Sequence, residues 1–139
     1  MTSSESTFSL IEFIKISKRV YIIGNGGSYA NAMHICNDLL SKGVKAYTLD
    51  PSTLVAFSND FGFNNCFAHW LNIVAEENDL LIAMSGSGKS ENILRAIEVA
   101  DRKGMNVYKI FGNERGEDMQ QAEESQLRIG HEVWKLLGL

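Results

Sequence analysis

The sequence predicts an α/β protein, a three-layer α/β/α sandwich around a parallel sheet of four or five strands. Short and almost entirely apolar runs recur along the chain, at about residues 19–23, 44–49, 79–84 and 106–111. Segments with the 3.6-residue apolar period of a helix lie between them. Strands that are apolar on both faces and alternate with helices are typical of a parallel sheet covered on both sides.

The expected helices begin and end at recognisable residues. The first covers residues 4–16, with Phe8, Leu10, Ile11 and Ile14 on one side. The helix after the first strand starts at Ser28 and stops before Gly43, since glycine commonly follows a helix C-terminus. Pro51 opens a short helix, which residues 59–63 interrupt. The remaining helices are expected at about 64–76, 90–103 and 119–137.

Length and composition indicate one domain, 1–139, with an N-terminal helix (4–16), a core (19–112) and a C-terminal helix (119–137). A chain of 139 residues can form a single hydrophobic core. The net charge of −4, without a basic cluster, argues against nucleic acid or a membrane surface as partner. Neither a membrane span nor a signal-type segment is recognisable, so the cytoplasm is the expected location. The two cysteines, Cys36 and Cys66, are expected to be buried free thiols.

A glycine-rich turn, GNGGS, follows the first strand and opens the helix from Ser28. Such a turn leaves backbone N–H groups free at a helix N-terminus, where the helix dipole favours an anion. His34 and Asp38, four residues apart, then share one face of that helix. A dinucleotide site is not expected, because Tyr29 stands where the third glycine of GxGxxG belongs.

A second glycine–serine loop, SGSGKS (residues 85–90), follows the third strand and has three interpretations. It matches the P-loop pattern GxxxxGK[ST] except that Ala83 replaces the first glycine, and Lys89 would then bind nucleotide phosphates. Alternatively, Ser85, Ser87 and Ser90 form a hydroxyl cup for a sugar phosphate at the start of the next helix. The third interpretation is a plain turn with a capping serine. We favour the hydroxyl cup, because two such loops follow corresponding strand ends, where parallel sheets bind ligands.

Four stretches resemble, in order, the sugar isomerase (SIS) domain family: GNGGSYANAMHICNDL, SNDFGFNNCF, DLLIAMSGSGKSENILRAIEVADRKGMNV and QLRIGHEVWKLL. Within the family they look most like phosphoheptose isomerases, which convert sedoheptulose 7-phosphate to a heptose phosphate for surface polysaccharide. The resemblance is continuous over about residues 19–112 and returns at 123–137. It implies a SIS-type, Rossmann-like fold and a cytoplasmic aldose–ketose isomerase without a nucleotide cofactor. It also implies a homo-oligomer, a dimer or a tetramer.

The resemblance further implies roles for single residues. It places the catalytic pair at Asp38 and His131, one as base and the other as acid for proton transfer through an enediol. The implied substrate-binding residues are Asn25, Gly26, Gly27, Ser28, Asp60, Ser85, Gly86, Ser87, Ser90 and Glu123. No cofactor is required, but some members bind zinc, through positions that match His34, Asp38, Glu123 and His131.

The chain departs from the family pattern in ways that favour an alternative function. Asp38 replaces a glutamate, Gly86 a threonine and Lys42 an arginine, and the segment after Gly112 is too short for the family's final strand. A non-catalytic phosphosugar-binding or regulatory module is therefore the first alternative, and a P-loop nucleotide hydrolase is the second. Ordinary explanations also exist for single residues: Glu123 lies in an acidic stretch typical of a solvated helix face.

Overall fold

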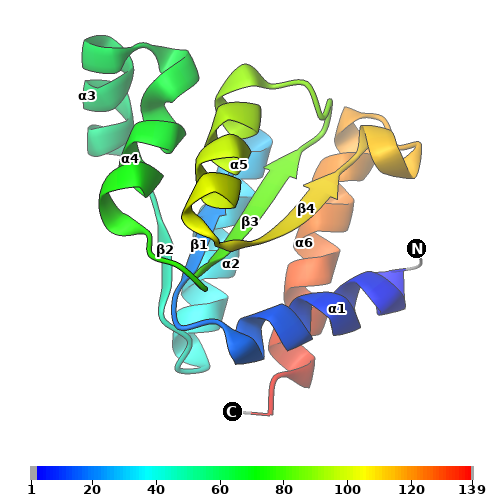
Figure 1. Cartoon of the computed structure of the whole chain (residues 1–139). Coiled ribbons are helices and arrows are strands. Elements are labelled where there is room, and N and C mark those ends of the chain that lie inside the picture. Colours follow the sequence, from blue (N-terminus) through cyan, green and yellow to red (C-terminus); the bar gives the residue numbers. More distant parts are fainter. Residues whose placement is uncertain (1–2, 139) are drawn as a thin grey trace.

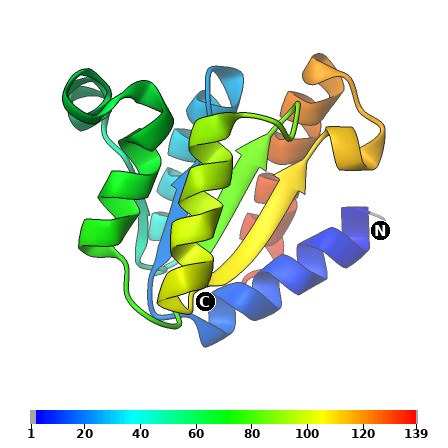
Figure 2. The ribbon, with the colours of Figure 1, turned by 45° about the horizontal axis from the view of Figure 1, so that its top comes forward.

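The computed structural model describes residues 3–138 and forms one four-stranded parallel sheet in the order β2-β1-β3-β4. Its elements are α1 (Ser3–Ile16), β1 (Val20–Ile23), α2 (Gly27–Ser41), β2 (Ala46–Thr48), α3 (Pro51–Phe61), η1 (Phe63–Asn65), α4 (Cys66–Val74), β3 (Leu80–Ser85), α5 (Glu91–Lys103), β4 (Asn106–Phe111), η2 (Asn113–Arg115) and α6 (Met119–Leu136). Helices cover both faces of the sheet, α5 on one side and α2 and α6 on the other (Figure 1, Figure 2). The predicted three-layer sandwich is confirmed, with four strands.

The two faces of the sheet belong to two separate hydrophobic clusters, because successive side chains of a strand point to opposite sides. In β1, Val20 and Ile22 pack with α1, α2 and α6, whereas Tyr21 and Ile23 pack with α4 and α5. The four residues of β1 and the six of β3 are all buried, as near-continuous apolar runs require. Cys36 and Cys66 are free and buried, as predicted.

Helix α1 and strand β2 differ in detail from the expected elements. Phe8 is 60% exposed, because the buried stripe of α1 passes through Thr7, Leu10, Ile11 and Ile14. Thr7 can face inward because its hydroxyl donates to the Glu132 carboxylate at 2.6 Å. The expected strand 44–49 is shorter, since only Ala46–Thr48 pair with β1.

The break predicted at residues 59–63 is present but shorter. α3 continues to Phe61, and Gly62, with φ 91°, ends it. A short 3₁₀ turn then leads into α4, which spans Cys66–Val74 instead of 64–76. Among residues 3–138, no helix has the length and apolar character needed to cross a bilayer.

Strand β4 is an edge of the sheet, and its outer side carries backbone groups without a strand partner in the described chain. Asn106 N donates to Asp79 O and Gly112 N donates to Ser85 O, so the backbone N–H and C=O groups of every second residue from Asn106 to Gly112 point toward β3. Val107, Lys109 and Phe111 therefore present their N–H and C=O groups outward. Exposed Lys109 projects from the middle of this edge, and lysine on an edge strand discourages pairing with another chain.

Candidate active site

The two glycine–serine loops lie side by side at the carboxyl edge of the sheet. They follow β1 and β3, which are neighbouring parallel strands with Ile23 opposite Ala83. The loops are joined through Asn25 and Asn92, whose side-chain amides each donate one hydrogen bond to the other, at 2.8 and 2.9 Å. One ligand placed at this edge is therefore within reach of both loops.

The first loop presents two exposed glycines at the N-terminus of α2. Gly26 has φ 55°, and Ser28 N donates to Asn25 O at 2.9 Å, which closes the turn. Ser28 itself is buried. A Cβ on Gly27 would overlap Glu123 Oε2, so the Glu123 carboxylate sits directly over this glycine. A carboxylate at a helix N-terminus is stabilised by the helix dipole.

The second loop uses two of its serine hydroxyls to hold its own shape. Buried Ser85 accepts a hydrogen bond from Gly88 N at 2.9 Å, and exposed Ser87 accepts one from Lys89 N at 3.1 Å. Ser90 is the N-cap residue of α5, but its side chain makes no capping hydrogen bond. The serine hydroxyl hydrogens and the backbone N–H groups at the start of α5 can therefore donate hydrogen bonds to an anion.

Gly86 is packed against the beginning of α6. A Cβ at this position would overlap Met119 Sδ and would lie 3.6 Å from Ala122 Cβ. Met119 therefore occupies the space into which the side chain of the family's threonine would extend.

A cluster of two histidines and an aspartate lies between α2 and α6. His34 Nε2 is 3.1 Å from His131 Nε2 and 3.3 Å from Asp38 Oδ2. One ligand atom from each of the three side chains lies within 4.8 Å of the others. His34 and His131 are exposed, so the cluster is open to solvent. Two imidazoles and a carboxylate can exchange a proton with a bound molecule or hold a metal ion together.

Close contact between α2 and α6 brings His131 to His34. At Gly130 the helices touch, since a Cβ there would lie 2.6 Å from Ile35 Cγ1. Further along, Trp134 Nε1 donates to Ser41 Oγ at 2.9 Å. The glycine before His131 is thus a sequence signal for the close approach.

Between the loops and the histidines, a polar strip follows the seam of α2 and α6. Asn31 Nδ2 donates to Glu123 O at 2.9 Å and to Gln126 Oε1 at 3.0 Å. Gln126 is completely buried, and its Nε2 has no hydrogen-bond partner in the described part of the chain. At 1.5 Å per helical residue, His34 lies about 10 Å along α2 from Gly27. Glu123 belongs to the loop end of this strip and is not part of the His34–Asp38–His131 cluster.

Asp60 lies on α3 rather than on either loop or on the seam of α2 and α6. It is exposed in the last turn of α3, a helix without a buried residue, and accepts a hydrogen bond from its neighbour Asn59 at 3.1 Å. No hydrogen bond or ion pair described in residues 3–138 connects Asp60 to either loop.

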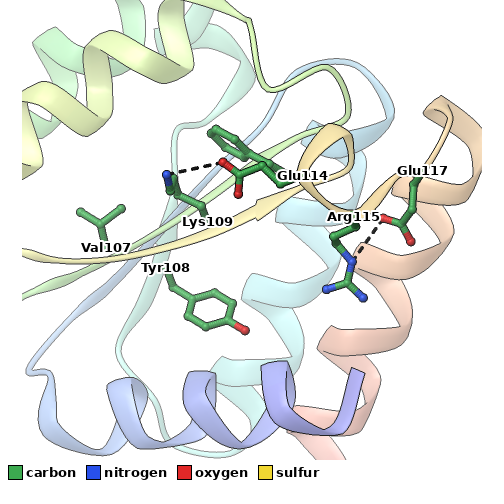
Figure 3. Close-up of a pocket in the computed structure, with 7 residues that line it drawn as sticks. Val107, Tyr108, Lys109, Glu114, Arg115 and Glu117 are labelled. Atoms are coloured by element: carbon green, nitrogen blue, oxygen red, sulfur yellow. Dashed lines mark ion pairs between the residues drawn. The ribbon is translucent and has the colours of Figure 1, made fainter. Parts of the chain in front are cut away.

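A hollow of about 540 Å³ lies elsewhere, beside β4 (Figure 3). It is lined by Val107, Tyr108, Lys109, Phe111, Glu114, Arg115 and Glu117. Ion pairs join Lys109 Nζ to Glu114 at 3.7 Å and Arg115 Nε to Glu117 at 3.3 Å. None of the predicted site residues lines this hollow, so it follows the open sheet edge rather than the candidate active site.

Comparison with known families decides the assignment. A family model described as "SIS domain" matches residues 7–112. The chain belongs to the SIS domain family. This SIS domain is 39% identical over 114 residues to a phosphoheptose isomerase of a Nitratiruptor species, covering 76% of this chain and 61% of that protein. It is 36% identical over 137 residues to the phosphoheptose isomerase of Sodalis glossinidius, covering 93% and 70%.

Solved structures agree with the fold of this SIS domain. A phosphoheptose isomerase from Francisella tularensis has a TM-score of 0.81 at 25% identity, covering 96% of this chain and 82% of the other. The enzyme from Neisseria gonorrhoeae has a TM-score of 0.84 at 21% identity, covering 96% and 83%. The SIS domain spans 61% and 64% of the length of two phosphoheptose isomerases that it matches. Family membership favours the hydroxyl-cup interpretation of the second loop over the P-loop.

Proposed function

We propose that this SIS domain is a phosphosugar aldose–ketose isomerase whose substrate is sedoheptulose 7-phosphate. One arrangement supports the proposal most: two glycine–serine loops joined by the Asn25–Asn92 amide pair continue, along one seam, into the His34–Asp38–His131 cluster. Several similar proteins are named phosphoheptose isomerases.

In this proposal the second loop binds the phosphate. Ser85, Ser87 and Ser90 donate hydroxyl hydrogens, and the backbone N–H groups at the start of α5 add the favourable end of the helix dipole. At the first loop, backbone groups of Asn25, Gly26, Gly27 and Ser28 contact the open-chain sugar, as do the Glu123 and Asp60 side chains. Gly86 lies within the second loop and contacts the phosphate. Asp60 is exposed and has no described hydrogen bond to either loop, so in this proposal it reaches the sugar through a movement of α3 or from a second copy of the chain.

Isomerisation moves one proton between adjacent carbons through an enediol. A base removes the proton from C1 of the ketose while an acid gives a proton to the carbonyl oxygen at C2; the enediol then receives a proton at C2 and loses one from the C1 oxygen. Asp38 and His131 carry these roles in our proposal. Their connection through His34, at 3.3 and 3.1 Å, supports proton exchange between them.

The same three side chains also fit a zinc ion as an optional cofactor. Tetrahedral zinc with bonds of about 2.0–2.1 Å places its ligand atoms about 3.3 Å apart, close to the 3.1 and 3.3 Å separations measured here. A zinc ion held by His34, Asp38 and His131 would act as a Lewis acid toward a sugar oxygen. Glu123, near Gly27, would need to move along the seam to join it as a fourth ligand.

We further propose that the chain acts in the cytoplasm as a homo-oligomer. Its α3 region supports association with a second copy, because large apolar side chains are exposed there: Val55, Phe61, Phe63 and Ile73. Size-exclusion chromatography with light scattering measures the number of subunits directly.

The decisive experiment incubates the purified chain with sedoheptulose 7-phosphate and follows the aldose product by NMR. In D₂O, an enediol mechanism incorporates deuterium at the carbon that receives the proton. We expect Asp38→Asn and His131→Ala each to lower turnover at least a hundredfold, while Asp101→Asn, an exposed control on α5, retains it. Binding without turnover in the unmodified chain, with or without added Zn²⁺, would instead identify a phosphosugar-binding module.

A further inference from the structure

Two side-chain amides, joined by reciprocal hydrogen bonds, connect the two loops. Asn25 Nδ2 donates to Asn92 Oδ1 at 2.8 Å, and Asn92 Nδ2 donates to Asn25 Oδ1 at 2.9 Å. Asn25 belongs to the first loop, and Asn92 lies in the first turn of α5, directly after the second loop. The two residues are 67 positions apart, so this pair fixes the spacing of elements that the chain itself does not connect closely.

The surroundings of Asn92 make the pair difficult to exchange for water. Asn92 is 1% exposed, and its amide also approaches Sγ of completely buried Cys66, on α4, at 3.9 Å. Cys66 is the titratable side chain in contact with Asn92; the adjacent Glu91 pairs outward with Arg95 at 3.0 Å. A buried amide that loses its partner carries the full cost of its desolvation. The amide pair is therefore strongly favoured over two separate side chains.

The pair also determines how each loop presents its backbone. Asn25 O accepts the hydrogen bond from Ser28 N that closes the first turn, so the orientation of Asn25 sets the exposed backbone of Gly26 and Gly27. On the other side, Asn92 follows Ser90, the N-cap residue of α5, by two positions.

We propose that Asn92 is a positioning residue, which acts through Asn25 to set the distance between the two loops so that both contact one sugar phosphate. This inference rests on the proposed function. In this arrangement the side chain of Asn25 binds Asn92 rather than the ligand, and the backbone of the first loop faces the ligand.

The test replaces one amide by a group whose hydrogen bonding depends on protonation. In Asn92→Asp at pH 8, the introduced carboxylate still accepts from Asn25 Nδ2 but has no hydrogen to donate to Asn25 Oδ1. We expect the Kd for sedoheptulose 7-phosphate, measured by calorimetry, to rise about tenfold over the unmodified chain. At pH 5 the buried carboxyl, with its pKa raised by desolvation, is protonated and donates O–H, which restores both hydrogen bonds. At pH 5 the Kd of Asn92→Asp, divided by the Kd of the unmodified chain at the same pH, should then be only about two.

Two variants control for other causes. Asn92→Leu has a similar size without polar atoms, so its binding should be weaker at both pH values, with no recovery at pH 5. Asn106→Asp makes the same chemical change at the opposite end of the sheet, where Asn106 Nδ2 donates to Ser17 Oγ at 3.3 Å, and its Kd ratio should stay near one. An Asn92→Asp ratio that is the same at pH 8 and pH 5 would overturn the inference, as would normal binding by Asn92→Leu.

A second measurement separates this inference from the proposed function. If the unmodified chain binds no sedoheptulose 7-phosphate, the proposed function fails, and the backbone amide NMR resonances of Gly26 and Gly27 then test the positioning role. We expect Asn92→Asp to displace these resonances at pH 8 and to return them toward the unmodified positions at pH 5. Resonances that stay in place at pH 8 would show that Asn92 does not control the first loop.

Discussion

Gly130 is the point at which a single methyl group should disturb the His34–His131 contact. In Gly130→Ala the added Cβ would lie 2.6 Å from Ile35 Cγ1 and 3.0 Å from Cδ1. Carbon atoms in contact are normally about 3.5–4.0 Å apart, so about 1 Å of extra space is needed. Ile35 is 4% exposed and packed in the core. We therefore expect α6 to move away from α2 and to carry His131 with it.

The expected change in stability is small because two effects oppose each other. Alanine is better than glycine in a helix by about 1 kcal/mol, whereas overpacking a core contact costs about 1–3 kcal/mol. Urea denaturation of Gly130→Ala should therefore give a free energy of unfolding lower by about 1 kcal/mol. The effect on turnover should be much larger, on the order of a hundredfold, because a displacement of about 1 Å has this consequence for a catalytic group.

A second substitution at the same contact provides the control. Ile35→Ala removes both atoms that the new methyl meets, at a cost of its own of about 2–5 kcal/mol. The double variant Gly130→Ala/Ile35→Ala no longer has the steric conflict. Its loss of unfolding free energy should therefore be smaller than the sum of the losses of the two single variants, by at least about 1 kcal/mol. If the losses add within about 0.5 kcal/mol and turnover of Gly130→Ala is normal, the helix contact does not position His131.

Three further substitutions test other parts of the structure. Asp50 caps α3 by accepting from Thr53 N at 3.0 Å, and hydrogen bonds from the side chain and the backbone of Thr53 lower the pKa of its carboxyl below the ordinary 3.8. The Asp50 carboxylate therefore stabilises the fold above pH 3.8, and this stabilisation is lost as the pH falls through the lower pKa of the folded state. The difference in urea midpoint between the unmodified chain and Asp50→Ala should accordingly shrink in strong acid. Gly86→Thr alone should weaken sugar-phosphate binding severalfold by displacing Met119, whereas Gly86→Thr/Met119→Ala should gain a hydroxyl donor and bind more tightly than Met119→Ala, as calorimetry would measure. Lys109→Val should cause concentration-dependent association in sedimentation experiments, because it removes the charge from the open sheet edge, while Lys109→Glu should stay as dispersed as the unmodified chain.

The arrangement of strands and helices could be predicted because the strand segments are mostly apolar and each is followed by glycine or a polar residue. The predicted burial pattern and helix bounds were wrong where a single residue departs from the local sequence pattern. Thr7 occupies a core position because Glu132, distant in the sequence, accepts its hydrogen bond. The break predicted at residues 59–63 is limited to Gly62, because Asn59 and Asp60 remain in the last turn of α3.

The site was less predictable, because its organising contacts join residues far apart in the chain. The spacing of His34 and Asp38 on one helix is visible in the sequence, but the arrival of His131 depends on the close contact at Gly130. The Asn25–Asn92 pair has no local signal at all, since two asparagines near loops are common. Its presence follows only from the neighbouring positions of β1 and β3 in the sheet.

The position of Glu123 determines which helix N-terminus remains for a substrate phosphate. Its carboxylate already lies over Gly27, where it supplies the negative charge that the dipole of α2 favours. A phosphate at the same place would meet like charge, whereas the first turn of α5 has an acidic residue only at Glu91, which pairs outward with Arg95. We therefore expect the phosphate at the second loop and the uncharged hydroxyls of the sugar at the first. In that orientation we expect the reactive carbons to extend along the seam of α2 and α6 toward His34, where the proposed acid and base lie.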